Sequence, residues 1–281
     1  MAIRASLRSA LLALAVALAT AATGETGAAP AASPRYVAMG SSFAAGPGSG
    51  PLLPESGRCA RSVSNYPNLL AERLGMELID VSCSGATIDH LIGPWNELAA
   101  QIDAVTMDTA LVTITIGGND LGYIGGLIID ACEREAAQLQ NVRTCPARPE
   151  NSDSLQQMQM EMIDLFRQVR ARAPVARIIV VDYLAVLPQH ATCRALGLSR
   201  EEARRGKRIA AALASSTRLA AHIADIELVP VSKLLDGGHA CAAQPLVAAW
   251  YDDAGARNPV PFHPNAAGMK AIAELLAAHL Q

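Results

Sequence analysis

Aromatic side chains and blocks of like charge are both scarce in this chain. Phe, Trp and Tyr make up only 4% of the 281 residues, although apolar residues make up 51%. Small aliphatic side chains, mainly Ala and Val, must therefore fill the core, and the length allows one large α/β domain or two small ones. The formal net charge is −3 and no extended basic block occurs. A nucleic-acid partner is therefore not expected.

The sequence also lacks the cysteine patterns of a metal site. No Cys-x-x-Cys pair occurs and no cysteine has zinc-finger spacing from a histidine, so neither a metal ion nor a cofactor is expected. An even number of cysteines in an exported chain indicates disulfides. Six cysteines allow 15 pairings, and sequence positions alone select none of them. The six are Cys59, Cys83, Cys132, Cys145, Cys193 and Cys241.

The N-terminus has the pattern of a secretory signal. Arg4 and Arg8 precede a short apolar run over 11–19, and small residues around Ala21 offer a cleavage site. The run is too short for a comfortable membrane span, although an uncleaved anchor helix is the alternative. We predict a signal peptide over 1–22, an Ala/Gly/Pro/Ser-rich flexible linker over 23–34, and a secreted protein in the extracellular space or cell envelope.

The rest of the chain alternates strand and helix patterns. Apolar runs without polar alternation predict strands over 35–39, 77–81, 110–116, 177–181 and 226–231. Helical patterns lie over 66–74, 96–106, 152–173, 199–224 and 264–280. This alternation is typical of a parallel sheet covered on both faces. We predict one α/β domain over 35–281, a three-layer α/β/α sandwich with a five-stranded parallel sheet.

Four chemically useful residues follow predicted strands or precede the last helix. Ser42 follows the first strand, Gly85 the second and Asn119 the third, and His263 precedes the C-terminal helix. Active residues of parallel sheets collect at the carboxyl ends of the strands. Together these residues supply a nucleophile, oxyanion donors and a general base for acyl transfer. Taken singly, each has a plain alternative as a helix cap, a turn residue or a solvated loop histidine.

The order of these motifs resembles the secreted SGNH (GDSL-type) hydrolases. Actinobacterial members carry G-D-S-[YF]-A-A-G after the first strand, and this chain reads GSSFAAG over 40–46. Gly85 lies in CSGAT, Asn119 in the G-x-N-D block and His263 in H-P-N. The resemblance covers nearly the whole mature chain and implies a flavodoxin-like SGNH fold. It departs from the family pattern at Ser41, which stands where the family has Asp.

The resemblance implies a role for each motif. Ser42 corresponds to the nucleophile and His263 to the general base. The oxyanion hole would consist of the backbone N–H groups of Ser42 and Gly85 and the side-chain amide of Asn119. Secreted actinobacterial members often carry three sequential disulfides, which here would pair Cys59–Cys83, Cys132–Cys145 and Cys193–Cys241.

The usual carboxylate partner of the histidine is missing. Many family members have Asp three residues before the His, and this chain has Val260 there. A neutral imidazole still needs a partner at Nδ1. By analogy with Ser-His dyads, the Val260 main-chain carbonyl is the preferred partner, and Asp252 or Asp253 is the alternative.

The sequence thus predicts a secreted serine esterase or lipase that acts as a monomer on a small-molecule or lipid ester. Two alternatives stay open. The same site would suit a phospholipase or a carbohydrate deacetylase, and the Ser41 departure would suit a non-catalytic binding module on an inactive hydrolase fold.

Overall fold

A computed structural model describes residues 33–139, 144–148 and 154–281. Ser33–Gln281 cluster as one compact unit. The predicted signal peptide, and all but two residues of the predicted linker, lie outside the described residues. None of the described helices is both long and apolar enough to span a bilayer.

The predicted five-stranded parallel sheet is confirmed. The strands are β1 (Arg35–Gly40), β2 (Glu77–Asp80), β3 (Thr109–Thr115), β4 (Arg177–Val181) and β5 (Glu227–Val229), in the spatial order β2-β1-β3-β4-β5. All neighbouring strands pair in parallel. The order reverses direction beside β1, so the loops after β1 and β3 diverge there and open the crevice in which ligands of such sheets bind.

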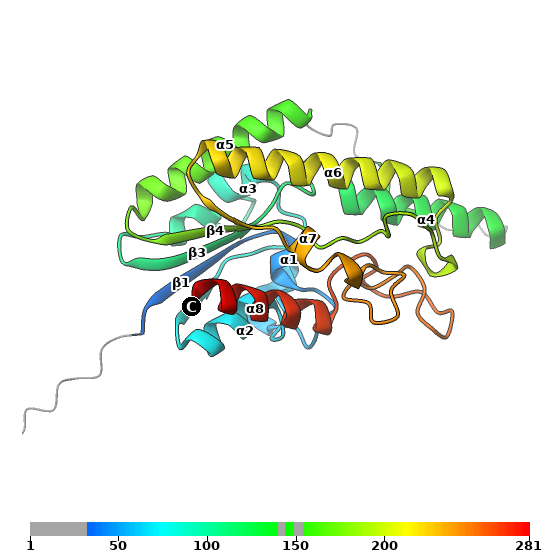
Figure 1. Ribbon diagram of the computed structural model, residues 1–281, viewed down its shortest axis with the longest axis horizontal. Coiled ribbons are helices and arrows are strands. Elements are labelled where there is room, and N and C mark those ends of the chain that lie inside the picture. The colour runs from blue at the N-terminus through cyan, green and yellow to red at the C-terminus, as the bar shows by residue number, and fades with distance from the viewer. Residues whose placement is uncertain (1–32, 140–143, 149–153) are drawn as a thin grey trace, which may run out of the picture. The chain divides into compact units, whose positions relative to one another are not determined.

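Helices cover both faces of the sheet (Figure 1). α2 (Tyr66–Leu74) packs against α8 (Ala266–Leu280) on one face, and α3 (Ile88–Ile92), α5 (Leu155–Arg172) and α6 (Arg200–Ile223) lie on the other. The remaining helices are α1 (Ser42–Ala45), α4 (Tyr123–Leu139) and α7 (Val231–Leu234). The short 3-10 helices are η1 (Pro54–Cys59), η2 (Gln101–Ala104), η3 (Arg194–Leu196) and η4 (Asp236–Gly238).

Local sequence signals set several helix ends. Ser199 caps α6 and accepts a hydrogen bond from the Glu202 N–H, while Glu202 accepts one from the Ser199 N–H, so the two residues form a capping box. α8 begins at Ala266 with Asn265 as its N-cap, so Pro264 precedes the helix and does not lie in its first turn.

The predicted helix over 96–106 is wrong. Only η2 forms within it, and a short bridge joins Trp95 to Leu98. Asn96 between them has φ +55°, in the left-handed region. An asparagine tolerates that conformation, and the reversal it produces ends any helix at this point.

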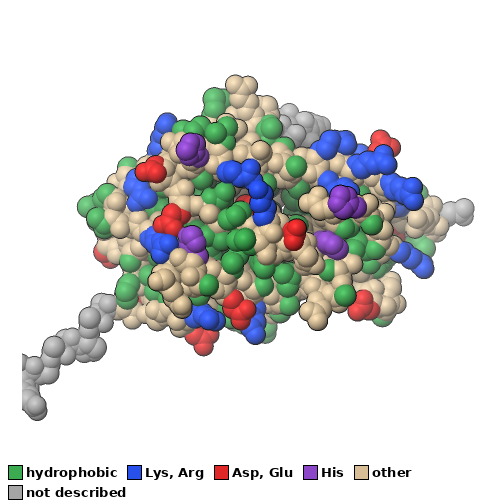
Figure 2. All heavy atoms as spheres, in the orientation of Figure 1, with side chains coloured by type: hydrophobic (Ala, Val, Ile, Leu, Met, Phe, Trp, Pro, Cys, Tyr) green, Lys and Arg blue, Asp and Glu red, His purple; other side chains and the backbone are tan. Residues whose placement is uncertain are grey.

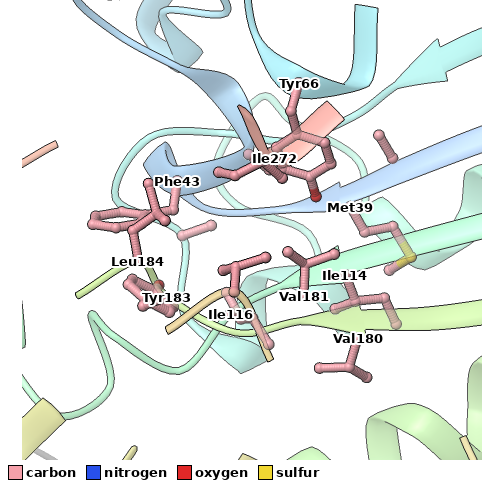
Figure 3. Packing of buried hydrophobic residues seen from close by; sticks show 14 of the residues in the cluster. Met39, Phe43, Tyr66, Ile114, Ile116, Val180, Val181, Tyr183, Leu184 and Ile272 are labelled. Atoms are coloured by element: carbon pink, nitrogen blue, oxygen red, sulfur yellow. The ribbon is translucent and has the colours of Figure 1, made fainter. Parts of the chain in front are cut away.

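The core lies between the sheet and both helical layers. Figure 3 shows Met39 of β1, Ile114 of β3 and Val180 of β4 beside one another along the sheet. Phe43, Tyr183 and Leu184 pack together past the carboxyl ends of these strands, and all three are buried. The chain therefore places scarce aromatic rings directly beneath the edge at which the predicted site residues lie.

Candidate active site

Ser42 starts the short helix α1 immediately after β1. Its side chain is buried, and its Oγ lies 2.9 Å from Nε2 of His263, a residue 221 positions later in the chain. Gly40, the last residue of β1, has φ +139°, and a Cβ there would lie 2.3 Å from the Thr115 carbonyl oxygen. Only glycine fits at this turn, which brings Ser42 over the edge of the sheet.

The tautomer of His263 follows from its second hydrogen bond. Nδ1 lies 2.9 Å from the carbonyl oxygen of Pro261, which can only accept. Nδ1 therefore carries the hydrogen, and Nε2 is free to accept the hydroxyl hydrogen of Ser42. Burial lowers the pKa of His263, while the Pro261 hydrogen bond opposes that shift. Loss of solvation disfavours the imidazolium, so the ring is held in its neutral form, which can accept a proton.

The predicted Val260 carbonyl is wrong as the partner of Nδ1, because the Pro261 carbonyl occupies that position. Phe262 has φ +62°, and this left-handed residue turns the chain so that the carbonyl two residues before His263 faces the ring. Backbone hydrogen bonds between Ala248 and both Phe262 and His263 hold this turn in place.

Asp252, offered as an alternative partner, lies in an exposed turn. Its carboxylate accepts a hydrogen bond from the Ala256 N–H, and Asp253 beside it is also exposed. No hydrogen bond or ion pair joins either carboxylate to His263 in the part of the chain that the structure describes. The imidazole is therefore oriented by main chain and not by an acid.

The three predicted oxyanion donors lie on adjacent loops. Gly85 has φ +88°, which glycine adopts readily. Asn119 donates a hydrogen bond from Nδ2 to the Ala86 carbonyl at 2.8 Å, and within the described residues the second Nδ2 hydrogen has no protein acceptor, so it can bind a ligand. One residue further on, Asp120 accepts a hydrogen bond from the Ile88 N–H at 2.9 Å. These two bonds tie the loop of Gly85 to the loop of Asn119.

Tyr183 is a site residue that the sequence did not reveal. It follows β4, and its hydroxyl oxygen lies 2.8 Å from Ser41 Oγ and accepts a hydrogen bond from the Gly118 N–H at 3.1 Å. Its ring centroid lies 4.3 Å from that of Phe43. Burial raises the pKa of Tyr183, so it stays a neutral phenol. Tyr183 thus joins the Ser41–Ser42 turn to the loop that carries Asn119, and its position after a strand was the only available signal.

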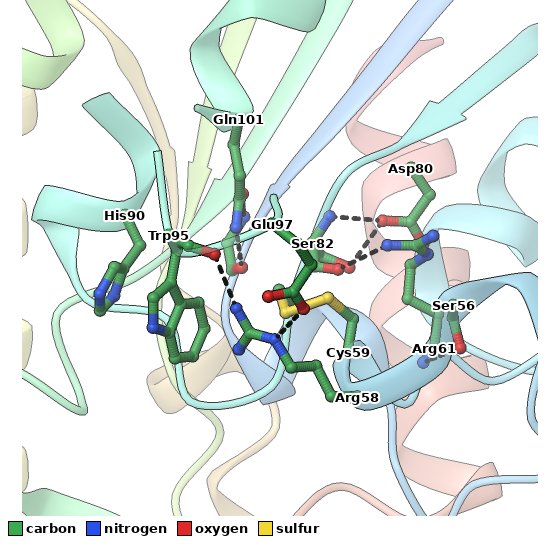
Figure 4. Close-up of a disulfide and its surroundings, with 12 residues drawn as sticks. Ser56, Arg58, Cys59, Arg61, Asp80, Ser82, His90, Trp95, Glu97 and Gln101 are labelled. Atoms are coloured by element: carbon green, nitrogen blue, oxygen red, sulfur yellow. Dashed lines mark hydrogen bonds and ion pairs between the residues drawn. A yellow bond between two sulfur atoms is a disulfide. The ribbon is translucent and has the colours of Figure 1, made fainter. Parts of the chain in front are cut away.

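Gln101 holds the end of β1 in a second way (Figure 4). Its amide oxygen accepts a hydrogen bond from the Gly40 N–H at 2.7 Å, and its amide nitrogen donates one to the Gly40 carbonyl at 3.0 Å. The side chain is buried, and it adds a second hydrogen bond to a Gly40 carbonyl that already accepts one from the Cys83 N–H at 3.0 Å. It lies within the region wrongly predicted as helix, and no sequence motif marks it.

The side chains of Arg58, Trp95 and His90 form a stack (Figure 4). The Arg58 guanidinium lies 3.9 Å from the centre of the Trp95 ring, and the His90 ring stacks on Trp95 with centroids 4.0 Å apart. Glu97 accepts a hydrogen bond from Arg58 at 2.7 Å. The edge of Trp95 would lie 3.3 Å from a Cβ added to Gly85. The stack therefore limits how far the Gly85 loop can move.

The three disulfides of the structure are Cys59–Cys83, Cys132–Cys145 and Cys193–Cys241, which confirms the sequential pairing implied by the resemblance. Cys83 stands two residues before Gly85, so the first bridge anchors the loop of a predicted oxyanion donor. Within the described residues, no group of three or more His, Cys, Asp and Glu side chains is placed to hold a metal ion.

A family model for the GDSL-like lipase/acylhydrolase family matches residues 38–271. The chain belongs to this family. The hydrolase is 33% identical to Lipase 2 of Streptomyces coelicolor over 292 aligned positions, covering 96% of each chain. It is also similar in fold to phospholipase A1 from Streptomyces albidoflavus NA297, with a TM-score of 0.70 and 24% identity, covering 88% of this chain and 99% of that one. An extracellular lipase of Streptomyces rimosus gives a TM-score of 0.68 at 24% identity, covering 87% and 98%.

These findings make the hydrolase a carboxylic ester hydrolase, and the predicted SGNH fold is confirmed. Its site contains a hydroxyl–imidazole pair with hydrogen-bond donors on two neighbouring loops. Such an arrangement has the parts that acyl transfer needs.

Proposed function

We propose that the hydrolase cleaves carboxylic esters through an acyl-enzyme on Ser42, with His263 as the general base. The observation that carries this proposal is the 2.9 Å contact of Ser42 Oγ with the Nε2 of an imidazole whose Nδ1 donates to the Pro261 carbonyl. That tautomer is the one a general base requires.

The reaction then has two halves. In the first, His263 Nε2 takes the hydroxyl proton while Ser42 Oγ attacks the ester carbonyl carbon. The imidazolium returns this proton to the departing alcohol oxygen, which leaves the acyl group on Ser42. In the second half, water attacks the acyl carbon, His263 takes a proton from it, and the free carboxylic acid leaves as Ser42 recovers its proton.

The oxyanion formed in each half would be stabilised by the Ser42 and Gly85 N–H groups and the Asn119 amide. The two bonds between their loops support this role, since donors fixed before the reaction need no rearrangement during it. A single donor of this kind contributes about 3–4 kcal/mol to transition-state stabilisation.

We also propose that residues 1–22 are a cleaved signal peptide and that the hydrolase acts outside the cell. The three disulfides support an oxidising compartment, and the related Streptomyces rimosus lipase is described as extracellular. Similarity to a lipase supports an ester with an apolar acyl group as the substrate of this hydrolase.

Labelling with a fluorophosphonate probe tests the nucleophile directly. We expect Ser42→Ala to abolish both turnover of p-nitrophenyl esters and labelling. Ser41→Ala is the matched control, because it removes the neighbouring hydroxyl, and it should retain both. Loss of labelling in folded Ser41→Ala would show that the assignment is wrong, and activity across acyl chain lengths would separate an esterase from a lipase.

A further inference from the structure

A cavity of about 290 Å³ lies beside the candidate active site and shares none of its four predicted residues. It is bounded by α6, by the segment that follows β4, and by the start of α7. Figure 2 shows hydrophobic side chains gathered in the middle of this face of the molecule, with Lys and Arg side chains near them.

The walls of the cavity are mainly apolar. They come from two aromatic rings and from aliphatic side chains on three segments, and most of the larger ones are buried. Such a surface binds hydrocarbon, and the volume is close to that of small-ligand pockets. The apolar lining residues are Tyr123, Tyr183, Leu184, Val186, Leu187 and Leu213, with alanines 185, 210, 211 and 214.

The charged lining residues are all cationic. Lys207, Arg218 and Lys233 line the cavity, and no Asp or Glu does. Lys207 and Lys233 are two of the only three lysines in the sequence. Lys207 Nζ donates a hydrogen bond to the Gln189 carbonyl at 3.1 Å, so it is held beside the cavity. In the part of the chain that the structure describes, neither lysine forms an ion pair with a carboxylate.

One acidic residue, Asp182, lies close to these cationic lining residues. Asp182 accepts hydrogen bonds from the N–H and hydroxyl of Ser232 at 2.9 and 2.5 Å. It also attracts Arg218, whose charge helps to lower the pKa of the Asp182 carboxyl against the larger opposing effect of burial. The positive charge of Arg218 is thus partly neutralised by Asp182. The two lysines therefore carry the positive charge that is available to a ligand.

We propose that this cavity binds a fatty carboxylate, the product class that ester hydrolysis releases when the acyl group is apolar. An apolar pocket fits the hydrocarbon chain, and the lysines favour the carboxylate. The neutral ester and the alcohol product lack the charge that these lysines recognise, so the site distinguishes the acid product from the other reactants. The proposal rests on the apolar acyl preference of the proposed function.

Tyr183 connects the cavity to the catalytic turn. Its ring forms part of the wall, while its hydroxyl contacts Ser41 and Gly118. A bound carboxylate would therefore pack on the residue that holds Ser42 and Asn119 in position. We expect it to lower kcat as well as raise KM, which is mixed inhibition, and not to compete purely with substrate.

Calorimetry on the Ser42→Ala protein measures binding without turnover. We expect decanoate to bind with one-to-one stoichiometry, at least tenfold more tightly than decanol. Lys207→Gln combined with Lys233→Gln should weaken decanoate binding about tenfold and change decanol binding less than twofold. Lys270→Gln is the matched control, because it removes the third lysine, which lies on α8 outside the cavity, and it should change neither.

A second variant fills the cavity. Ala214→Phe places a ring in the space between α6 and the wall, so it should weaken both ligands. The proposal is overturned if decanoate shows no saturable binding, if decanol binds as tightly, if the paired lysine variant binds decanoate normally, or if inhibition of the wild-type enzyme is purely competitive. Failure of the proposed function would instead appear as turnover of p-nitrophenyl acetate by Ser42→Ala, whatever the binding results.

Discussion

The imidazole of His263 is oriented by a peptide carbonyl. A carbonyl fixes the tautomer as well as a carboxylate does, but it carries only a partial charge and stabilises the imidazolium less. The position of this carbonyl depends on a single left-handed residue, Phe262, which is fully buried. A residue of this type adopts such a backbone conformation only when the surrounding structure enforces it.

Removing the nearby acids should therefore have little effect on catalysis. We expect Asp252→Asn and Asp253→Asn each to change kcat/KM by less than about tenfold, which corresponds to 1.4 kcal/mol. Steady-state kinetics on a soluble ester provide the measurement. A loss near the roughly 10⁴-fold effect of amidating a triad Asp would identify a hidden third member.

The lowered pKa of His263 predicts an acid-shifted pH profile. The proposed mechanism needs the neutral ring, and burial disfavours its protonation, so the ring stays unprotonated to lower pH than a free histidine. We expect kcat/KM to fall as pH decreases with a midpoint below about 6.5, the ordinary value. A midpoint above 7 in a pH series of kcat/KM would contradict the assignment of His263 as the base in this environment.

Tyr183→Phe should damage the site through position alone. The variant keeps the ring but removes the hydroxyl, leaving the buried Gly118 N–H and Ser41 hydroxyl without that partner. We expect a loss of about 1–3 kcal/mol in the free energy of unfolding, together with slower fluorophosphonate labelling. Ser41→Ala is the control, since the Gly118 bond survives in it. Equal effects of the two variants on stability would argue against the double role of Tyr183.

At the scale of elements, regular strands and capped helices were predictable because their signals are local. The apolar run 177–181 matches β4, and the helical pattern 199–224 agrees with α6 to within one residue at each end. The helix predicted over 96–106 does not form. The prediction rested on apolar spacing, and spacing does not reveal that Asn96 adopts a left-handed backbone conformation. Tyr183 and Gln101 were missed because their partners lie 142 and 61 residues away, and no local pattern specifies such contacts.

The candidate site itself was predictable to a different degree. Sequence motifs identified Ser42, Gly85, Asn119 and His263, because each lies in a short recognisable motif next to a predicted strand or helix. The carbonyl that orients the ring was misplaced by one residue. The sequence can indicate that a main-chain carbonyl orients the imidazole, but it does not show which one. The choice between Val260 and Pro261 depends on the φ angle of Phe262.

The disulfides also act on elements, and their loop lengths predict their order of importance. Cys193–Cys241 closes a separation of 48 residues and Cys132–Cys145 one of 13. Replacing both cysteines of a bridge by Ser should cost about 2–4 kcal/mol, with the longer loop costing about 1 kcal/mol more. Urea unfolding of the two matched double variants measures this difference. A larger loss for the shorter loop would show that native contacts, and not unfolded-state entropy, dominate.

At the scale of the whole molecule, the parallel sheet brings distant blocks to one edge. Ser42 and His263 come from the first strand–helix turn and from the approach to the last helix, α8, which packs beside α2 on one face of the sheet. Under the proposed mechanism, activity therefore needs both ends of the domain and does not belong to any contiguous segment. At the same edge, the single side chain of Tyr183 separates the cavity beside α6 from the Ser41–Ser42 turn.

The 221 residues between hydroxyl and imidazole also set an order of events in time. The serine leaves the ribosome early and the histidine near the end, and contacts so far apart in sequence close late during folding. A refolding chain should therefore recover its tryptophan fluorescence before its esterase activity. The test dilutes the protein from urea with its disulfides intact and follows tryptophan fluorescence and the turnover of a fluorogenic ester side by side. Recovery of turnover then reports when the last part of the domain has folded.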